Sequence, residues 1–472
     1  MIALSLGEVA QLANARLVPA EAATLMVTGS VETDSRLVGP GALFIAKPGE
    51  FTDGHNFVAA ARSAGAVAAI VEREVTSQET QGFPQLVVEN SVLALGRLAA
   101  GVLQRVREKG DIRVVGITGS NGKTTTKNML RAILESVGPT VSPIESYNNE
   151  VGAPISILKI DESTRYLVAE LGADGLGSIA YLAKMLQPDI AVELKVGMAH
   201  AGKFGGIETT ARIKAELIEE LAPSALAVLN VDDNYVRGMA EKFDGRKVWF
   251  GTGDQAGYRA TNLAVTLNGT SFDLHWPDGE TQVVNLQILG EHHVMNALAS
   301  LAVADQLGVD RKLAVKNLSS MPLAERWRMQ LHNRPDNVTV INDAYNASPD
   351  STKAALQTLA QLGRQSGRRT IAVIGEMSEL GEFAAVEHDA IGRLAVRLNL
   401  DQVVAIGLVA KPVHMGATLE GSYDGESVYF DTIEQAEPAI REMLRSGDIV
   451  LVKSSKSANL RYLGDALMEV KA

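Results

Sequence analysis

The chain has 472 residues, of which 46% are hydrophobic and 21% charged, and its formal net charge is −12. This length fits about three domains of roughly 150 residues. The excess of acidic residues argues against non-specific electrostatic binding of nucleic acid. The absence of cysteine excludes disulfides and thiolate nucleophiles, as expected in a reducing cytoplasm. We expect neither a signal peptide nor stable membrane insertion, because no apolar run approaches the ~20 residues that span a bilayer.

The first segment, residues 1–108, is predicted to be a self-contained α/β domain. Its opening residues, Leu6 to Leu17, have helical periodicity, and a long helix is predicted over Val92–Arg107. Between them the pattern predicts a helix at Asn56–Ala64 and strands at Ala66–Val71 and Leu86–Val88.

Two polar clusters stand out in this segment, Thr33-Asp-Ser-Arg36 and Asp53-Gly-His-Asn-Phe57. Ser35 and Arg36 could hydrogen-bond and charge-pair with a diphosphate. A polar turn with a surface arginine is the alternative, since exposed arginines are common.

The second segment, residues 109–325, opens with the stretch from Arg113 to Lys127, around which the chain is organised. A β-branched run predicts a buried strand, which ends in a glycine-containing turn and continues as a helix. Backbone N–H groups of such a loop and helix start point at one place and bind anions. Lys123 would add a positive charge for the outer phosphates, and the Thr124 hydroxyl is placed to hold Mg²⁺. The residues expected at the nucleotide are Thr118, Gly119, Ser120, Asn121, Gly122, Lys123, Thr124 and Thr125.

The strict phosphate-loop spacing fails in this stretch, because Ile117 stands where the pattern requires a glycine. A chance Gly-Lys-Thr in a turn is the alternative. The strand before the loop and the helix after it favour the nucleotide site.

Downstream, strands at Tyr166–Ala169, Ile190–Val192 and Leu226–Leu229 alternate with helices, which predicts a parallel sheet. Glu170 leaves the first of these strands and is a candidate Mg²⁺ ligand, with a solvated loop carboxylate as the alternative. An all-β interruption is predicted from Tyr258 to Leu289, followed by a helix.

The third segment, residues 326–472, is a second α/β pattern. It is predicted to be doubly wound, with ligand at the carboxyl ends of its strands. The predicted strands are Val338–Ile341, Thr370–Ile374, Gln402–Ile406, Ser427–Phe430 and Ile449–Val452.

The loop spelling Thr-Gly-Ser-Asn-Gly-Lys-Thr-Thr resembles that of the Mur ligase superfamily. The resemblance implies an N-terminal uridine-nucleotide-binding domain, a central phosphate-loop ATPase domain and a C-terminal Rossmann-like domain. It also implies ATP and two Mg²⁺ ions. His200 and Lys214 stand where the family has a metal-binding histidine and a lysine that becomes carbamylated, so Lys123, His200 and Lys214 are the implied catalytic residues. Without the resemblance, a lone histidine is more often structural and a lone helix lysine is solvated.

Further family positions follow from the resemblance. Asn296 matches an amide that reads the adenine edge, Arg326 an arginine that contacts ATP phosphate, and Asp343 a carboxylate that meets the ribose. Two residues depart from the family pattern: Lys195 replaces a frequent asparagine, and Glu325 replaces the glycine that usually precedes the arginine.

Two spellings resemble the superfamily branch that adds D-alanyl-D-alanine: Tyr147-Asn-Asn-Glu-Val-Gly-Ala-Pro154 and Asp343-Ala-Tyr-Asn-Ala-Ser-Pro349. The resemblance places Asn148, Asn149, Tyr345 and Asn346 at the substrates. It implies an amide ligase that joins D-Ala-D-Ala to UDP-MurNAc-tripeptide through an acyl phosphate, in cytoplasmic peptidoglycan precursor synthesis. We expect a monomer that binds no nucleic acid.

Two alternatives remain from the sequence. A sister ligase, either the one that adds the third stem residue or folylpolyglutamate synthase, would share the loop and differ in the amine pocket. A non-catalytic nucleotide-binding scaffold would need only the loop and would leave Glu170, His200 and Lys214 without a purpose.

Overall fold

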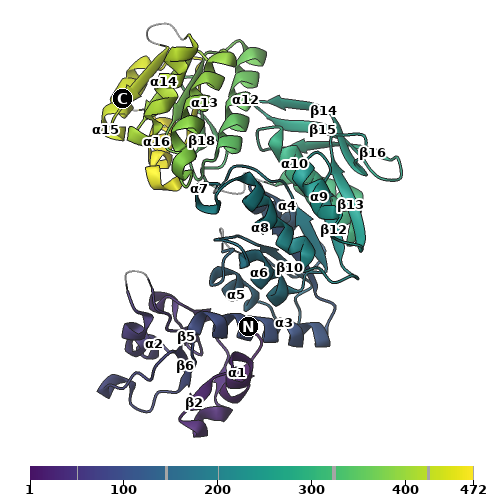
Figure 1. Cartoon of the computed structure of the whole chain (residues 1–472), viewed down its shortest axis with the longest axis vertical. Coiled ribbons are helices and arrows are strands. Elements are labelled where there is room, and N and C mark those ends of the chain that lie inside the picture. Colours follow the sequence, from purple (N-terminus) through teal and green to yellow (C-terminus); the bar gives the residue numbers. More distant parts are fainter. Residues whose placement is uncertain (50–51, 144–146, 200, 322–325, 422–425, 471–472) are drawn as a thin grey trace.

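A computed structural model describes residues 1–472 except 50–51, 144–146, 200, 322–325, 422–425 and 471–472. Three α/β units follow one another along the long axis of the molecule, from the N-terminal unit to the C-terminal one (Figure 1). The α/β class and the three-domain architecture are therefore confirmed. Within the described residues, no helix is long and apolar enough to cross a membrane.

The N-terminal unit is built on a five-stranded sheet with the order β2-β7-β6-β5-β4. A two-stranded sheet of β1 and β3 lies beside it. The elements are β1 (Leu4–Ser5), α1 (Leu6–Ala13), β2 (Arg16–Val18), β3 (Met26–Val27), β4 (Val31–Glu32), β5 (Leu43–Ile45), α2 (Val58–Ser63), β6 (Ala68–Val71), β7 (Gln85–Val87) and α3 (Ser91–Lys109).

The first helix is shorter than its periodicity predicts. Helix α1 ends at Ala13 because Asn14 adopts a left-handed conformation with φ 53° and caps it. The chain then continues as β2, which pairs antiparallel with β7. The apolar residues after Asn14 therefore extend the sheet and not the helix.

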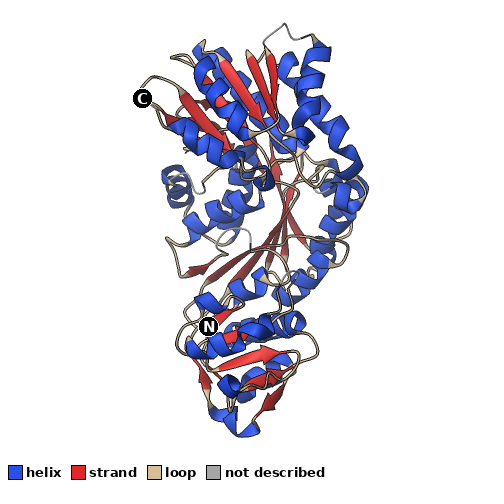
Figure 2. Ribbon diagram, turned by 90° about the vertical axis from the view of Figure 1, so that its left-hand side faces the viewer, coloured by secondary structure: helices blue, strands red, loops and turns tan. Residues whose placement is uncertain are grey.

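The central unit is a nine-stranded sheet with the order β16-β15-β14-β13-β12-β11-β8-β10-β9. Figure 2 shows its strands in the middle of the molecule, between helices. Its strands from β9 to β13 pair in parallel, as predicted. The elements are β8 (Arg113–Thr118), α4 (Lys123–Leu134), β9 (Thr140–Val141), α5 (Gly152–Ile157), β10 (Tyr166–Glu170), α6 (Ser178–Leu186), β11 (Ile190–Glu193), α7 (Ala201–Phe204), α8 (Ile207–Glu219), β12 (Leu226–Asn230), α9 (Asn234–Ala240), β13 (Arg246–Gly251), β14 (Tyr258–Thr266), β15 (Gly269–His275), β16 (Thr281–Leu286), α10 (His292–Gln306) and α11 (Arg311–Ser320).

The predicted all-β interruption is part of this sheet. Strand β14 pairs parallel with β13, and β15 and β16 continue antiparallel to the edge. The first hairpin turns at Gly269, whose φ is 129° and where a Cβ would lie 2.0 Å from the carbonyl oxygen of Leu286. Only glycine fits such a close approach.

The C-terminal unit is a six-stranded sheet with the order β17-β18-β22-β19-β20-β21. All its pairs are parallel except β17 with β18. The elements are β17 (Gln330–Asn333), β18 (Thr339–Asp343), α12 (Pro349–Ser366), β19 (Thr370–Ile374), α13 (Ala384–Arg397), β20 (Gln402–Ile406), α14 (Lys411–Glu420), β21 (Ser427–Phe430), α15 (Ile433–Met443), β22 (Ile449–Lys453) and α16 (Leu460–Met468).

Two buried apolar clusters join neighbouring units. One combines α1 and α3 with the central sheet, through residues such as Leu98, Val102 and Leu167. The other runs from α4 and α10 into the C-terminal unit, through residues such as Leu298, Leu356 and Ile374. The three units are therefore packed against one another by continuous apolar contact.

Candidate functional site

The loop between β8 and α4 lies where the strand order reverses. Strand β8 is flanked by β10 on one side and β11 on the other, so the loop occupies the switch point at which α/β sheets bind ligands. Gly119 and Gly122 have φ values of 144° and 90°. The Lys123 ammonium folds back over the loop and donates to the Gly119 carbonyl at 2.6 Å. Burial lowers the pKa of Lys123, while Glu170 and Glu193 oppose that shift.

Two carboxylates flank the loop, one from each neighbouring strand. Glu170, at the end of β10, is fully buried and accepts from Thr124 Oγ1 at 3.3 Å and from Asn148 Nδ2 at 3.4 Å. Its other oxygen lies 3.5 Å from Nζ of the buried Lys127. The structure thus brings together three residues predicted separately as metal and substrate contacts, and adds Lys127.

The second carboxylate is Glu193, which the sequence analysis missed. It ends β11 opposite Thr118, and both its oxygens are buried without a hydrogen-bond partner. Burial raises its pKa to about 8, although the nearby Lys214 lowers it. A buried charge without hydrogen bonds is strongly unfavourable, so this carboxylate is suited to receive a cation.

Lys214 lies on the buried face of α8 with only 2% of its surface exposed. Its Nζ is 3.5 Å from Thr118 Oγ1. Burial and the charge of Lys123 lower the pKa of Lys214 to about 7, against the opposing effect of Glu193. A neutral amine is therefore available at this position near neutral pH.

The described residues fit a hard cation at this edge of the sheet. Thr124 and Glu170 supply adjacent oxygens, and Glu193 supplies two unpaired ones. His200 lies outside the described residues. Among the residues that are described, no three His, Asp or Glu side chains are grouped to hold a metal, so a full ligand shell would need other oxygens.

A cavity of about 740 Å³ adjoins the loop, large enough for a nucleoside. Asn296 lies against the loop, since a Cβ at Gly122 would be 2.3 Å from Asn296 Oδ1. Lys195 lines the same cavity, and its carbonyl accepts from the Ser120 N–H at 2.8 Å. Burial lowers the pKa of His292, another lining residue, to about 4, so the imidazole is neutral at physiological pH.

The C-terminal unit reaches the loop from the other side. Ser348 Oγ donates to Asn121 Oδ1 at 3.1 Å, and Asp350 accepts from the Met198 N–H at 2.9 Å. Both residues belong to the start of α12. These contacts form the interface between the central and C-terminal units, called here the seam.

Two arginines near the start of the third segment lie at different distances from the loop. Arg326, the predicted phosphate contact, pairs with Asp465 at 2.8 Å with 68% of its side chain exposed. Arg328 instead lies 3.4 Å from Thr124 Oγ1 and over the Tyr345 ring at 4.4 Å. The charge of Arg328 also contributes to lowering the pKa of Lys123, after burial. In the sequence, only the position of Arg328 two residues after Arg326 could have pointed to it as a phosphate contact.

The predicted ribose and amine contacts lie on the C-terminal side of the seam. Asp343 pairs with the buried Lys453 at 2.7 Å. Its charge opposes the lowering of the His292 pKa by burial. Tyr345 presents its ring to Arg328, and the Asn346 carbonyl accepts from Lys453 at 2.6 Å. Asp343, Tyr345 and Asn346 do not line the cavity described above, and Asp343 is already paired.

The remaining predicted substrate residues have local partners. Asn149 Oδ1 accepts from the N–H of Gly152, the first residue of α5, at 2.9 Å. Arg36, in the N-terminal unit, forms a two-point pair with Asp34 and has 86% of its side chain exposed. Ser35 precedes it in the same short helix, Ser35–Leu37.

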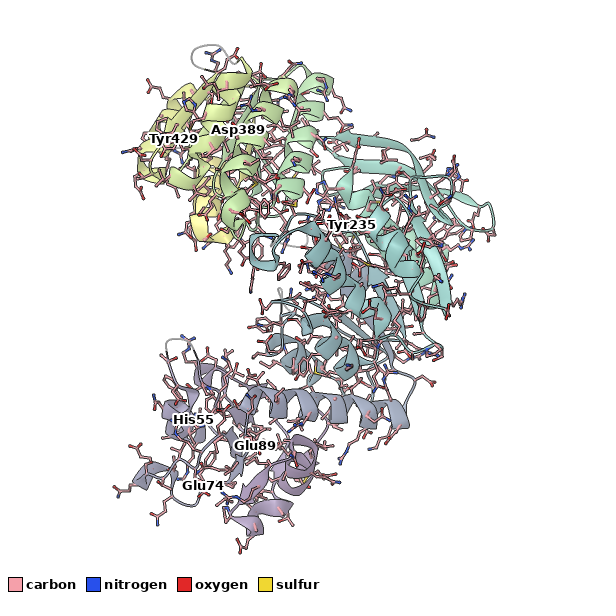
Figure 3. The ribbon with its side chains drawn as sticks, viewed as in Figure 1. His55, Glu74, Glu89, Tyr235, Asp389 and Tyr429 are labelled. Carbon is pink, nitrogen blue, oxygen red and sulfur yellow. The ribbon has the colours of Figure 1, made fainter. Side chains whose placement is uncertain are left out.

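The second polar cluster of the N-terminal unit is structural. His55 (Figure 3) is buried between Asp53, at 2.6 Å, and the Glu72 N–H, which donates to its Nε2 at 2.8 Å. A satisfied buried histidine of this kind holds the loop in place.

Comparison with known proteins assigns the chain to a family along its whole length. It matches the models of the Mur ligase family catalytic domain at residues 28–102, the Mur ligase middle domain at 117–304 and the Mur ligase glutamate ligase domain at 327–456. It is 39% identical to UDP-N-acetylmuramoyl-tripeptide–D-alanyl-D-alanine ligase of Mycobacterium tuberculosis, with 99% of this chain and 98% of that protein covered. It is 33% identical to the Escherichia coli protein of the same name, with 99% of each covered.

Solved structures agree with this assignment. A crystal structure of MurF from Acinetobacter baumannii superposes with a TM-score of 0.89 at 32% identity, with 99% of each chain covered. MurF from Thermotoga maritima in complex with ADP gives a TM-score of 0.79 at 30% identity, with 93% of this chain and 96% of that chain covered. The chain therefore belongs to the Mur ligase family, and within it to the group of UDP-N-acetylmuramoyl-tripeptide–D-alanyl-D-alanine ligases.

Proposed function

We propose that this chain joins D-alanyl-D-alanine to UDP-N-acetylmuramoyl-tripeptide with consumption of ATP, as a monomer in the cytoplasm. The observation that carries the proposal is its full-length similarity to ligases of that name. The loop flanked by Glu170 and Glu193 supports it, because a non-catalytic scaffold would gain nothing from a buried, unpaired carboxylate. In this proposal the first segment, residues 1–108, binds the uridine nucleotide. The second, residues 109–325, binds ATP, and the third, residues 326–472, completes the ligase site.

The chemistry requires activation of a carboxylate, which is a poor electrophile. Transfer of the γ-phosphoryl group onto the terminal carboxylate of the tripeptide gives an acyl phosphate and ADP. The free amine of D-Ala-D-Ala then attacks the acyl carbon, and phosphate leaves from the tetrahedral intermediate. Lys123, the loop N–H groups and Arg328 would stabilise the charge on the transferring group. The seam between the central and C-terminal units would exclude water from the acyl phosphate.

Mg²⁺ would neutralise phosphate charge when bound. We propose that Thr124 and Glu170 hold one ion and that Glu193, His200 and a carbamylated Lys214 hold a second. Ser35 and Arg36 would contact the uridine diphosphate, and Asn148, Asn149, Tyr345 and Asn346 the peptide and dipeptide. Asn296 and Asp343 would contact ATP, and Arg326 would reach it only by leaving its pair with Asp465.

A phosphate-release assay tests the function. Release should require UDP-MurNAc-tripeptide and D-Ala-D-Ala together, and supplying tripeptides that end in lysine or diaminopimelate would identify the third residue. Release with a single amino acid in place of the dipeptide would indicate a sister ligase. Nucleotide binding without any release would indicate a scaffold.

A further inference from the structure

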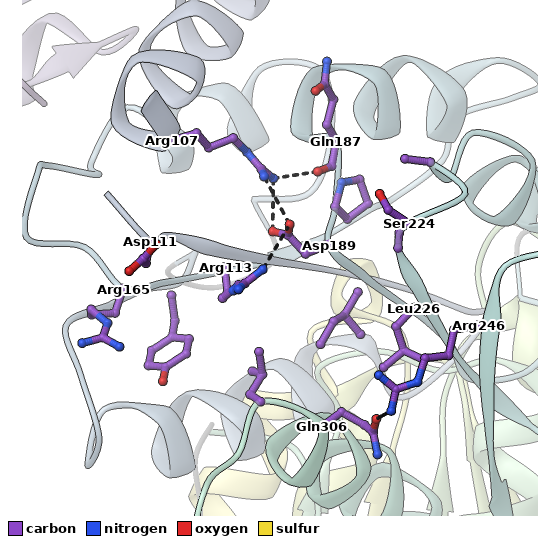
Figure 4. A pocket seen from close by; sticks show the side chains of 16 residues that line it. Arg107, Asp111, Arg113, Arg165, Gln187, Asp189, Ser224, Leu226, Arg246 and Gln306 are labelled. Carbon is purple, nitrogen blue, oxygen red and sulfur yellow. Dashed lines mark hydrogen bonds and ion pairs between the residues drawn. The ribbon is translucent and has the colours of Figure 1, made fainter. Parts of the chain in front are cut away.

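Four arginines gather at the amino ends of the central strands, the edge of the sheet opposite the phosphate loop. They line a cavity of about 780 Å³ (Figure 4), called here the arginine cavity. These residues are Arg107 at the end of α3, Arg113 at the start of β8, Arg165 just before β10 and Arg246 at the start of β13. Because parallel strands begin at the same edge, Arg113 and Arg165 lie on adjacent strands, whereas Arg246 lies four strands from Arg165, roughly 19 Å at about 4.8 Å per strand.

Asp189 holds one of the four guanidinium groups. It accepts from the Val114 N–H at 2.7 Å and lies 3.3 Å from Arg107. Arg107 also donates to the Gln187 carbonyl at 2.7 Å. This contact is structural: it ties α3 to the start of β8.

The other three guanidinium groups are weakly compensated. Arg113 lies 4.0 Å from Asp189, and Arg246 donates to the neutral amide of Gln306. The guanidinium group of Arg165 has no hydrogen bond or ion pair with any described residue, although its backbone is hydrogen-bonded. All three are exposed. The second carboxylate of the cavity, Asp111, is also exposed. Positive charge is therefore in excess here, although the whole chain carries −12.

The chemistry of the lining identifies a ligand class. Guanidinium groups present paired N–H donors that match phosphate oxygens. Tyr166, Ile190 and Leu226 are buried beside them and offer apolar contact for the uncharged part of a ligand. We propose that the arginine cavity binds a small molecule that carries a diphosphate group.

This site is separate from the phosphate loop. Strand β8 runs from Arg113 to Thr118 between the two, a span of roughly 17 Å at about 3.3 Å per residue. The proposal does not depend on the ligase reaction, because none of the four arginines contacts the residues assigned to it. The diphosphate could come from an adenine nucleotide or from a uridine nucleotide, which have this group in common.

Equilibrium dialysis of radiolabelled pyrophosphate against the full chain tests the proposal. The phosphate loop is first saturated with Mg²⁺ and a non-hydrolysable ATP analogue. The Arg36→Ala background removes the diphosphate contact proposed in the N-terminal unit. In this background the chain should then bind one further equivalent of pyrophosphate, and added salt should weaken that binding. The double variant Arg113→Ala/Arg165→Ala, with its two positions on the adjacent starts of β8 and β10, should bind at least tenfold more weakly. The charge-matched double variant Arg16→Ala/Arg259→Ala, with both positions outside the cavity, should bind within twofold of that background.

Asp111→Asn gives the opposite prediction, because it removes a carboxylate from the cavity. It should tighten pyrophosphate binding severalfold, and this result remains decisive if the double arginine variant fails to fold. Competition with ADP and UDP then distinguishes the two sources, since at least one should displace the label. Complete loss of binding when the loop is saturated would overturn the proposal. Unchanged affinity in both cavity variants, or displacement by neither nucleotide, would do the same.

Discussion

At the scale of single residues, the site is dominated by charges that burial makes unfavourable. Lys123, Glu193 and Lys214 share one water-poor space beside the loop, and the pKa of Lys214 falls to about 7 while that of Glu193 rises to about 8. Groups whose pKa values are shifted toward neutrality by burial and by one another are typical of functional sites. The same shifts make the amine of Lys214 reactive, because only the neutral form captures CO₂.

The first prediction follows from this amine. A lysine at its usual pKa of about 10.4 is almost wholly protonated at pH 8, whereas Lys214 gains neutral amine as pH rises through about 7. With ¹³C-bicarbonate, the wild-type chain should therefore show a carbamate NMR signal that grows from pH 6 to pH 8. Lys214→Ala should lose the signal and most activity, and acetate should partly restore the activity by filling the vacated space.

Lys184→Ala is the matched control, because Lys184 is an exposed lysine of the same unit that pairs with Glu220. It should keep both the signal and the activity. A wild-type chain without the signal, or full activity in Lys214→Ala, would contradict the carbamate.

The second prediction separates two neighbouring arginines. Arg328 contacts Thr124 and acts on Lys123, so Arg328→Ala should lower the phosphate-release rate by about 10²–10³, the usual effect of removing one transition-state contact. Arg326→Ala should have a much smaller effect, since it removes an exposed ion pair with Asp465. Equal losses in both variants would show that Arg326 moves to the phosphates during turnover.

At the scale of elements, most of the fold could be predicted from the sequence. β-Branched runs located β19, β20 and β21 to the residue, because buried parallel strands are continuous apolar segments. The predicted first helix was too long, because Leu17 continues the helical spacing of apolar residues. The left-handed conformation of Asn14, which ends α1, leaves no mark on that spacing. The strand β13 was missed because Arg246 is exposed and Lys247 is only partly buried, so that its first residues show no apolar pattern.

The site was only partly predictable for a related reason. The position after a strand predicted Glu170 as a metal ligand, and family resemblance implied Lys214. The structure places both beside the loop. Glu193 was missed because it stands inside an apolar run, between Val192 and Leu194, where one carboxylate has no local signal. Its importance depends on the pairing of β11 with β8, which is long-range information.

The third prediction concerns the capping box of α1. Ser5 accepts from the Glu8 N–H, Glu8 accepts from the Ser5 N–H, and Glu8 also pairs with Arg105 of α3 at 2.6 Å. These contacts lower the pKa of Glu8 from 4.5 to about 2, the backbone hydrogen bond of Ser5 contributing most. The folded chain therefore binds this proton less readily than the unfolded chain, so the contribution to stability is complete above pH 4.5 and is lost as pH falls toward 2.

Glu8→Gln should thus lower the thermal midpoint of wild type at pH 7, by the equivalent of about 1 kcal/mol for a weakened cap. The difference should shrink when the two proteins are melted at pH 3. Glu108→Gln on α3, where Glu108 accepts from Gln104, is the control and should show no such pH dependence. A difference that stays constant from pH 7 to pH 3 would exclude the carboxylate as its cause.

At the scale of the whole molecule, the seam between the central and C-terminal units brings the loop and the C-terminal domain together. Ser348 contacts Asn121, Asp350 contacts Met198, and the Gly202 N–H donates to the Glu379 carbonyl at 3.1 Å. One of these contacts involves the loop, and the other two involve residues that follow β11. Ligase chemistry therefore depends on how closely the two units approach.

The last prediction introduces a steric block at this seam. A Cβ at Gly202 would lie 2.2 Å from the carbonyl carbon of Leu380 and 2.3 Å from the N of Gly381, and neither backbone can yield as a side chain would. Gly202→Ala should therefore hold the units apart, increasing the radius of gyration in small-angle X-ray scattering with a bound ATP analogue. Turnover should fall at least tenfold, because the C-terminal residues would no longer reach the loop. Gly238→Ala, where a Cβ meets no atom within 4 Å, should change neither quantity. Normal turnover together with a wild-type radius in Gly202→Ala would show that the ligation step does not require this close contact.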